Sequence, residues 1–188
     1  KYRQRVVVTG LGVVAPGAKN TAQFLKVLQS GNSPIEQVLE SEEKGLGCCV
    51  GGIAEFDREI LGEYYDYFGF EKASSFVQLA CAAGLEAWKN AHLPIPEFKS
   101  NTVDYDTGII IGAGLGAVDF VASRVAPAVD SGRNIKMGSS AVAMTMLSGP
   151  AAFLSAMLAT GNVHYGNSNA CCTGTDAILE GYHKIKLG

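Results

Sequence analysis

Two short runs of β-branched residues, each ending in a glycine-rich turn, most constrain how this chain can fold. The first is "RVVVTGLGVV" at residues 5–14, and the second is "DTGIIIGAGLGA" at residues 106–117. Continuous apolar runs of this length are typical of strands buried on both faces, as in parallel sheets covered by helices. The glycines let the backbone approach a neighbouring segment closely. The sequence therefore predicts an α/β fold with a parallel sheet.

Helical patterns follow each run. Residues 21–30 predict a helix that Asn20 or Thr21 caps and Gly31 ends. Its apolar stripe comprises Phe24, Leu25 and Leu28. Residues 71–91 predict a second helix, packed against a sheet, with this stripe at helical spacing: Phe76, Leu79, Ala80, Ala83, Ala87 and Trp88. Residues 33–67 are mixed and contain one short strand candidate, "CCVGGIAEF".

The last third of the chain repeats the alternation. Residues 139–161 predict an apolar helical stretch that Gly149 and Pro150 kink or split. Residues 162–170, "NVHYGNSNA", are expected to be extended. Residues 171–188 then predict a final helix with Gly188 as its C-terminal cap and an apolar stripe of Ile178, Tyr182 and Ile185.

Composition excludes several classes of function. The chain has 188 residues and 47% hydrophobic content, so it can bury the core of one domain or of a large piece of one. The net charge of -3 and the scattered Lys and Arg residues argue against a nucleic-acid partner. The apolar runs fall short of the roughly 20 residues that span a bilayer. We expect a cytoplasmic protein without a signal peptide or membrane partner.

The five cysteines do not have the spacing of a structural zinc site. We therefore expect reduced thiols, no disulfide and no metal. The pair Cys171 and Cys172 lies where the extended run becomes a helix. At such a position the unpaired amides favour a reactive thiolate and can stabilise an oxyanion. The alternative is that both are small buried residues, which is common for free cysteine.

The histidines are poorly placed to assist Cys171. His183 lies roughly 18 Å further along the same predicted helix at about 1.5 Å per residue. His164 precedes Cys171 by roughly 23 Å of extended chain at about 3.3 Å per residue. Only for His92, in the loop near "NAHLPIP", does local chain geometry place no limit on the distance to Cys171.

A dinucleotide-binding oxidoreductase is a second hypothesis. The stretch Gly10 to Ala15, "GLGVVA", fits the G-x-G-x-x-A fingerprint after a predicted strand. However, the helix should begin within that motif, whereas Pro16, Gly17 and the cap at Asn20 delay it. Glu36, in the loop after the first helix, does not match the acidic residue that should end a second strand.

Several motifs together resemble the β-ketoacyl-acyl carrier protein synthases, the condensing enzymes of fatty acid and polyketide synthesis. They are "RVVVTGLGVVAPG", "LQSGNSPI", "DTGIIIGAGLGA", "IKMGSSAVAMTMLSG" and "NSNACCTGTDAI". The last is similar to the family's nucleophile motif, Ala-Cys-Ala-(Ser/Thr)-Gly. The resemblance selects Cys171 rather than Cys172 as the nucleophile.

The resemblance implies a thiolase-like fold of two similar five-stranded halves. Residues 1–188 would be the N-terminal portion of such a domain, with the C-terminal half absent. It further implies that Cys171 accepts an acyl chain, that its amide is half of the oxyanion hole, and that Leu115, Met144 and Met146 lie at the acyl pocket. Acyl and malonyl thioesters on the phosphopantetheine of an acyl carrier protein would be the substrates, with no separate cofactor. A homodimer is expected.

The sequence departs from the family pattern at three points. Cys172 stands where alanine is usual, and Pro34 stands where glycine is usual. The family's two catalytic histidines, its lysine and its second oxyanion loop have no counterpart in these residues. A non-catalytic partner subunit or an inactive fragment of the same fold is therefore an alternative to the active enzyme.

Overall fold

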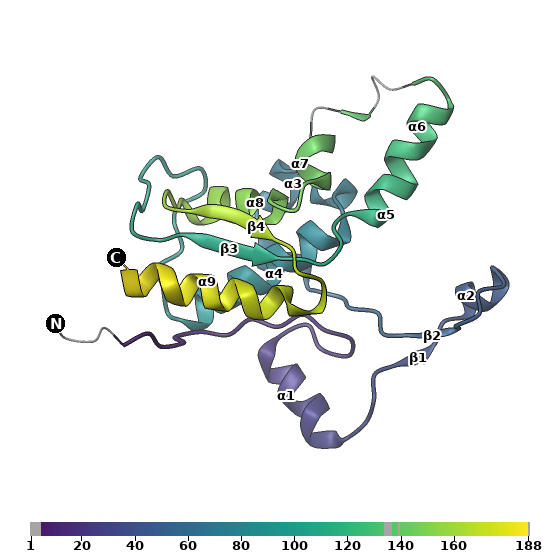
Figure 1. Ribbon diagram of the computed structural model, residues 1–188, viewed down its shortest axis with the longest axis horizontal. Coiled ribbons are helices and arrows are strands. Elements are labelled where there is room, and N and C mark those ends of the chain that lie inside the picture. The colour runs from purple at the N-terminus through teal and green to yellow at the C-terminus, as the bar shows by residue number, and fades with distance from the viewer. Residues whose placement is uncertain (1–4, 134–136, 139, 188) are drawn as a thin grey trace.

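The centre of the fold is a pair of parallel strands with helices on both sides. The computed structural model describes residues 5–133, 137–138 and 140–187. Strand β3 (Ile109–Gly112) pairs with β4 (His164–Asn167), so that both strands end at the same edge. Helix α9 (Thr173–Leu187) packs against β3, while α8 (Gly149–Leu158) packs against both strands and against α4 (Ser75–Asn90) (Figure 1).

The other elements are shorter and surround this centre. They are α1 (Thr21–Ser30), β1 (Glu36–Gln37), α2 (Leu39–Glu43), β2 (Val50–Gly51), η1 (Arg58–Leu61), α3 (Tyr64–Tyr67), η2 (Phe70–Lys72), α5 (Val118–Phe120), η3 (Val121–Val125), α6 (Ala126–Asp130), α7 (Ala141–Thr145) and η5 (Ala170–Cys172). None of the helices within the described ranges is both long enough and apolar enough to cross a bilayer.

The hydrophobic core lies between α4, α8 and β3. Its fully buried side chains include Leu61, Phe70, Val77, Cys81 and Met157. The ring of Phe70 packs near those of Phe68 and Phe153, at centroid distances of 5.7 and 5.6 Å. Burial of large apolar side chains of this kind is the main source of stability in a small fold.

The longer helices and three of the strands follow the sequence pattern. Asn20 caps α1 by accepting a hydrogen bond from the amide of Gln23, and Gly31 ends the helix with φ of +67°. The apolar stretch at residues 139–161 is split into α7 and α8, and Pro150 lies in the first turn of α8. The strands β3 and β4 and the short β2 lie within the predicted segments. The predicted cap Gly188 lies outside the described residues.

Two predicted apolar stripes are largely exposed, and a third is half-buried. In α4 the predicted stripe is half-buried, with Phe76 and Trp88 packed against the core, while the fully buried residues are Val77, Cys81, Ala82 and Leu85. In α1, Leu25 and Leu28 are exposed. In α9 the whole predicted stripe, Ile178, Tyr182 and Ile185, is exposed. Helical spacing identifies a face, but only the neighbouring elements decide whether that face is covered.

The predicted strand at residues 5–14 is wrong. This segment lies extended along α4, where the Leu11 amide donates to Asn90 Oδ1 and the Val13 amide donates to Glu86 Oε2. Val7 and Val8 are 69% and 76% exposed. A β-branched run becomes a strand only where a partner backbone is available, and in the described structure β3 and β4 pair with each other. Of the expected five-stranded sheet, the described residues form this parallel pair.

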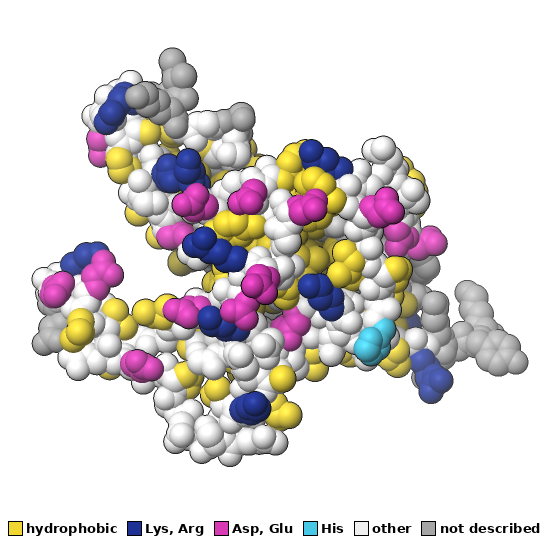
Figure 2. Space-filling model, turned by 180° about the vertical axis from the view of Figure 1, so that it is seen from behind, with side chains coloured by type: hydrophobic (Ala, Val, Ile, Leu, Met, Phe, Trp, Pro, Cys, Tyr) yellow, Lys and Arg dark blue, Asp and Glu magenta, His cyan; other side chains and the backbone are white. Residues whose placement is uncertain are grey.

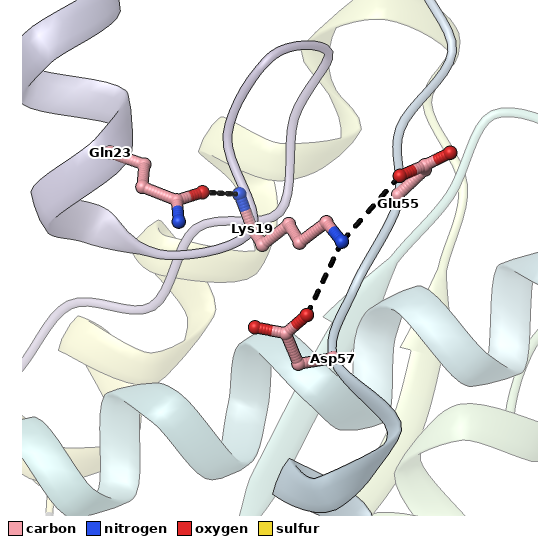
Figure 3. Close-up of polar contacts among 4 residues, drawn as sticks. All are labelled: Lys19, Gln23, Glu55 and Asp57. Carbon is pink, nitrogen blue, oxygen red and sulfur yellow. Dashed lines mark hydrogen bonds and ion pairs between the residues drawn. The ribbon is translucent and has the colours of Figure 1, made fainter.

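A projecting arm, which comprises β1, α2 and β2, extends away from the body (Figure 1). Its base is fixed by Lys19, whose Nζ lies 3.3 Å from Asp57 Oδ1 and 3.6 Å from Glu55 Oε2 (Figure 3). The hydrogen bond to Asp57 and its negative charge raise the pKa of Lys19. On the face drawn in Figure 2, acidic and basic side chains are interspersed with hydrophobic ones.

Candidate active site

Cys171 lies on the turn that connects β4 to α9. The strand ends at Asn167, two further residues lead into the 3-10 turn η5, and α9 begins at Thr173. Both Cys171 and Cys172 are exposed free thiols, so the alternative that they are buried core residues is wrong. The buried cysteine is Cys81 in α4. A strand-turn-helix placement of this kind presents a side chain at the edge of a sheet.

The nucleophile turn, which we define as residues 168–173, has a strained backbone. Ala170 has φ of +46°, in the left-handed region that a residue with a Cβ atom rarely adopts. Thr173 Oγ1 accepts from the Asn169 amide and donates to the Ala170 carbonyl oxygen, both at 2.7 Å. These two bonds enclose Ala170, and the Thr173 side chain that makes them is buried. The hydrogen bonds therefore offset the strain that places Cys171 at the surface.

A side-chain pair supports the same turn. Asn169 Nδ2 donates to Asp176 Oδ2 at 2.6 Å, and Asp176 is the acidic residue in the first turn of α9. The Cys172 amide donates to the Asn169 carbonyl oxygen at 3.0 Å. Asn169 is thus bonded through its amide, its carbonyl and its side chain.

The glycine turn after β3 closes the site from the other strand. The Ala113 amide donates to the Asn167 carbonyl oxygen at 3.1 Å, and Ser168 Oγ donates to the Gly114 carbonyl oxygen at 3.4 Å. A Cβ atom at Gly112 would overlap Asn167 and Thr173. Gly112 therefore permits the close packing of β3 against Asn167 and Thr173, as the glycine-rich turn in the sequence predicts.

The position of Cys171 favours nucleophilic chemistry. The first amides of a helix have no partner within that helix, and their partial positive charge favours an anion close by. Cys171 lies at this end of α9, and its own amide belongs to the turn. A thiol with an adjacent backbone donor can attack a carbonyl carbon while the amide stabilises the oxygen.

The three residues predicted at the acyl pocket lie in different surroundings. Leu115, on the glycine turn after β3, is 83% exposed. Met146, between α7 and α8, is 51% exposed. Met144 is only 3% exposed and belongs to the core, where its carbonyl oxygen accepts from Ser74 Oγ at 3.2 Å. Their role at a pocket stays a prediction.

The histidines lie away from the nucleophile turn along their elements. His164 begins β4, at the end opposite to Cys171, and its Nε2 is 3.0 Å from Thr160 Oγ1. His183 lies in the second half of α9, and His92 follows the C-terminal end of α4. Within the described part of the chain, no histidine nitrogen is hydrogen-bonded to Cys171.

Sequence reasoning missed Asn169 and Asp176 as parts of this site, and it included Thr173 only as the Ser/Thr position of the nucleophile motif. Their signal was the presence of polar capping residues around a predicted helix start, which is a common local pattern and does not by itself indicate a site. The significance of the three residues depends on the positive φ of Ala170, which the sequence does not reveal.

A parallel strand pair with helices on both sides and an exposed cysteine on the strand-to-helix turn defines the class: an α/β protein whose candidate site is centred on that cysteine. The particular family follows from comparison. Residues 3–188 match the family described as "Beta-ketoacyl synthase, N-terminal domain", and the chain belongs to this family.

Named relatives agree with this assignment. The chain is 28% identical over 187 residues to 3-oxoacyl-[acyl-carrier-protein] synthase 2 of Vibrio harveyi. This alignment covers 99% of this chain and 43% of the relative. It is 30% identical over 190 residues to 3-oxoacyl-[acyl-carrier-protein] synthase 1 of Haemophilus influenzae, with 98% of this chain and 44% of the relative covered. The chain thus spans less than half the length of these relatives.

Solved ketosynthase structures show the same fold. The ishigamide ketosynthase/chain length factor aligns with a TM-score of 0.69 at 19% identity, over 96% of this chain and 45% of that one. A chain from the structure of a type II polyketide synthase acyl-carrier protein in complex with its ketosynthase aligns with a TM-score of 0.66 at 20% identity. The alignment covers 99% of this chain and 49% of that one. The fold is the N-terminal part of the thiolase-like fold of ketosynthases, as expected.

The dinucleotide-binding hypothesis does not fit this structure. Gly10 and Gly12 lie against the backbone of α4, where a Cβ atom at either position would overlap Ala83, Ala87 or Ala91. The helix begins only at Thr21, after the turn in which Ala15 and Ala18 pair. The glycines therefore permit helix packing and do not cradle a pyrophosphate at a helix terminus.

Proposed function

We propose that this chain is the nucleophile-bearing part of a β-ketoacyl-acyl carrier protein synthase. The observation that carries the proposal is the exposed Cys171 on a strained, hydrogen-bonded turn at the start of α9. In the first step the Cys171 thiolate attacks the carbonyl carbon of an acyl thioester. The carbon–sulfur bond to the carrier breaks, the carrier leaves as a thiolate that takes up the proton Cys171 released to solvent, and the acyl chain stays on Cys171 as a new thioester. The Cys171 amide donates to the oxyanion in this step.

The second step is a decarboxylative condensation. A malonyl thioester loses carbon dioxide, its carbanion attacks the acyl carbon, and the Cys171 thiolate leaves as the carbon-carbon bond forms. The product is longer by two carbons. The histidines and lysine that the family uses have no counterpart in these 188 residues, so we assign condensation to a whole protein that supplies them. Leu115, Met144 and Met146 are proposed to contribute to the acyl pocket.

The proposed partners are acyl carrier proteins and a second copy of the chain. We propose no nucleic-acid or membrane partner. The names of the two relatives specify an acyl carrier protein, and one structural neighbour is bound to one. Phosphopantetheine thioesters would be the substrates in the cytoplasm, without a further cofactor or metal.

The test is intact-mass spectrometry before and after exposure to an acyl-carrier thioester. We expect an acyl adduct on the protein, an adduct of equal yield on Cys172→Ala, and none on Cys171→Ala. The two exposed neighbouring thiols are matched controls for each other. If the wild-type protein gains no adduct, or if the adduct persists in C171A, the acyl-acceptor role is wrong and an inactive partner subunit becomes the better description.

A further inference from the structure

We propose that the hydrogen bond between Asn169 and Asp176 positions Cys171 for acyl transfer, a role that rests on the function proposed above. Asp176 is then a positioning residue, because it acts through Asn169 and makes no contact with the acyl group. The bond joins the residue two places before the nucleophile to the first turn of the helix that follows it.

The turn needs supporting hydrogen bonds because of the backbone conformation of Ala170. A non-glycine residue in the left-handed region costs about 1–2 kcal/mol, so an unsupported turn would relax toward ordinary dihedral angles. Relaxation at Ala170 would rotate the peptide that precedes Cys171, and with it the direction of the Cys171 side chain and amide. The turn therefore has to be held from outside Ala170 itself.

Thr173 and Asp176 hold the turn in different ways. The Thr173 hydroxyl accepts from the Asn169 amide, four residues earlier in the chain, and donates to the Ala170 carbonyl oxygen, three residues earlier. Asp176 instead bonds the side chain of Asn169, over seven residues, and so ties the turn to the body of α9. Because a carboxylate only accepts, Asn169 presents its NH2 group to Asp176.

The carboxylate of Asp176 offers two contributions, its charge and its hydrogen bond to Asn169, and two variants separate them. Asp176→Asn removes the charge but keeps an oxygen acceptor of the same size, whereas Asp176→Ala removes both.

The helix offers a matched control for these variants. Glu180 is the next acidic residue on α9, one turn further along, and is also partly exposed. Its Oε2 accepts from the Tyr165 hydroxyl at 3.1 Å, away from the nucleophile turn. Glu180→Ala therefore removes a hydrogen-bonded carboxylate from the same helix without releasing Asn169.

The experiment measures single-turnover acylation of Cys171 as a function of acyl-carrier thioester concentration. For D176A and N169A we expect the maximal rate to fall about tenfold, since small misplacements of reacting groups have effects of this order or larger. The half-saturating concentration should stay unchanged. D176N should retain the wild-type rate, E180A should match wild type, and the N169A/D176A double variant should be no slower than either single variant.

The proposal is wrong if D176A acylates at the wild-type rate, if D176N is as slow as D176A, or if the two single effects multiply. Alkylation of Cys171 by iodoacetamide, separated from Cys172 by peptide mapping, supplies a readout that needs no acyl donor. If wild type is not acylated, the proposed function fails. In that case slower alkylation in D176A, with E180A unchanged, supports the positioning role, and equal alkylation refutes it.

Discussion

Two cysteines of this chain show how the surroundings of one residue decide its chemistry. Cys171 is exposed on the nucleophile turn, whereas Cys81 is fully buried between α4 and α8. Burial raises the pKa of the Cys81 thiol to about 12, because the charged thiolate is poorly solvated in the core. The same residue type is thus accessible to reagents at one position and is an apolar core residue at the other.

The buried thiol predicts a loss of stability at high pH. The folded-state pKa of Cys81 lies above its unfolded value near 9, so the unfolded chain releases this proton first. The part of the unfolding free energy that comes from this pKa difference is fully present below pH about 9. It is lost as the pH rises toward 12, at up to about 1.4 kcal/mol per pH unit. We expect the melting temperature of wild type to fall more steeply between pH 9 and 11 than that of Cys81→Ala. Parallel slopes for the two proteins would contradict this.

At the level of elements, the site depends on the approach of β3 to α9. Gly112 ends β3 against Asn167 and Thr173, with no room for a Cβ atom. The glycine turn after β3 and the nucleophile turn are therefore one packing unit. A change in one of these turns is expected to alter the geometry of the other.

Gly112→Ala tests this coupling. The added methyl group would displace Thr173, which holds Ala170, so we expect a loss of about 1–3 kcal/mol in unfolding free energy and slower acylation of Cys171. Urea denaturation and the acylation assay measure the two effects. Gly181→Ala in α9, where no atom lies within 4 Å of the new Cβ, should instead raise stability by about 0.5–1 kcal/mol. Equal behaviour of the two variants would show that β3 does not constrain the turn.

Across the whole molecule, one carboxylate ties the N-terminal segment to the core. Glu86 of α4 accepts from the Val13 amide at 2.8 Å and from the Thr21 amide at 2.6 Å, more than 60 residues away in sequence. These bonds place the segment before α1 along α4 and orient the start of α1.

Glu86→Ala is expected to release this segment. Loss of two hydrogen bonds to a charged acceptor should cost about 2 kcal/mol or more, and the freed amides of Val13 and Thr21 should exchange faster with deuterium. Hydrogen exchange read at single residues measures the change. Glu71→Ala, at an exposed acidic residue just before α4, serves as the control. Protection of Val13 and Thr21 that is unchanged in E86A would show that the segment is held by other contacts.

The sequence alone determined those features whose causes are local. The capped helix α1, the split of residues 139–161 just before Gly149 and Pro150, the glycine turn after β3, and the cysteine at the start of α9 all depend on residues close together in the chain. Propensity, capping and glycine conformation act over a few residues, so they can be identified without a fold.

The tertiary structure decided what depends on distant partners. Residues 5–14 have the composition of a strand, yet they lie along α4, because Glu86 and Asn90 bond their amides. Whether the apolar faces of α1 and α9 are covered likewise depends on neighbouring elements, which periodicity does not specify. The sequence by itself determined that Cys171 opens a helix after an extended run. Only the folded chain shows that Ala170 is held in a left-handed conformation, because the strain and the bonds that offset it arise when β4 and α9 meet at the turn.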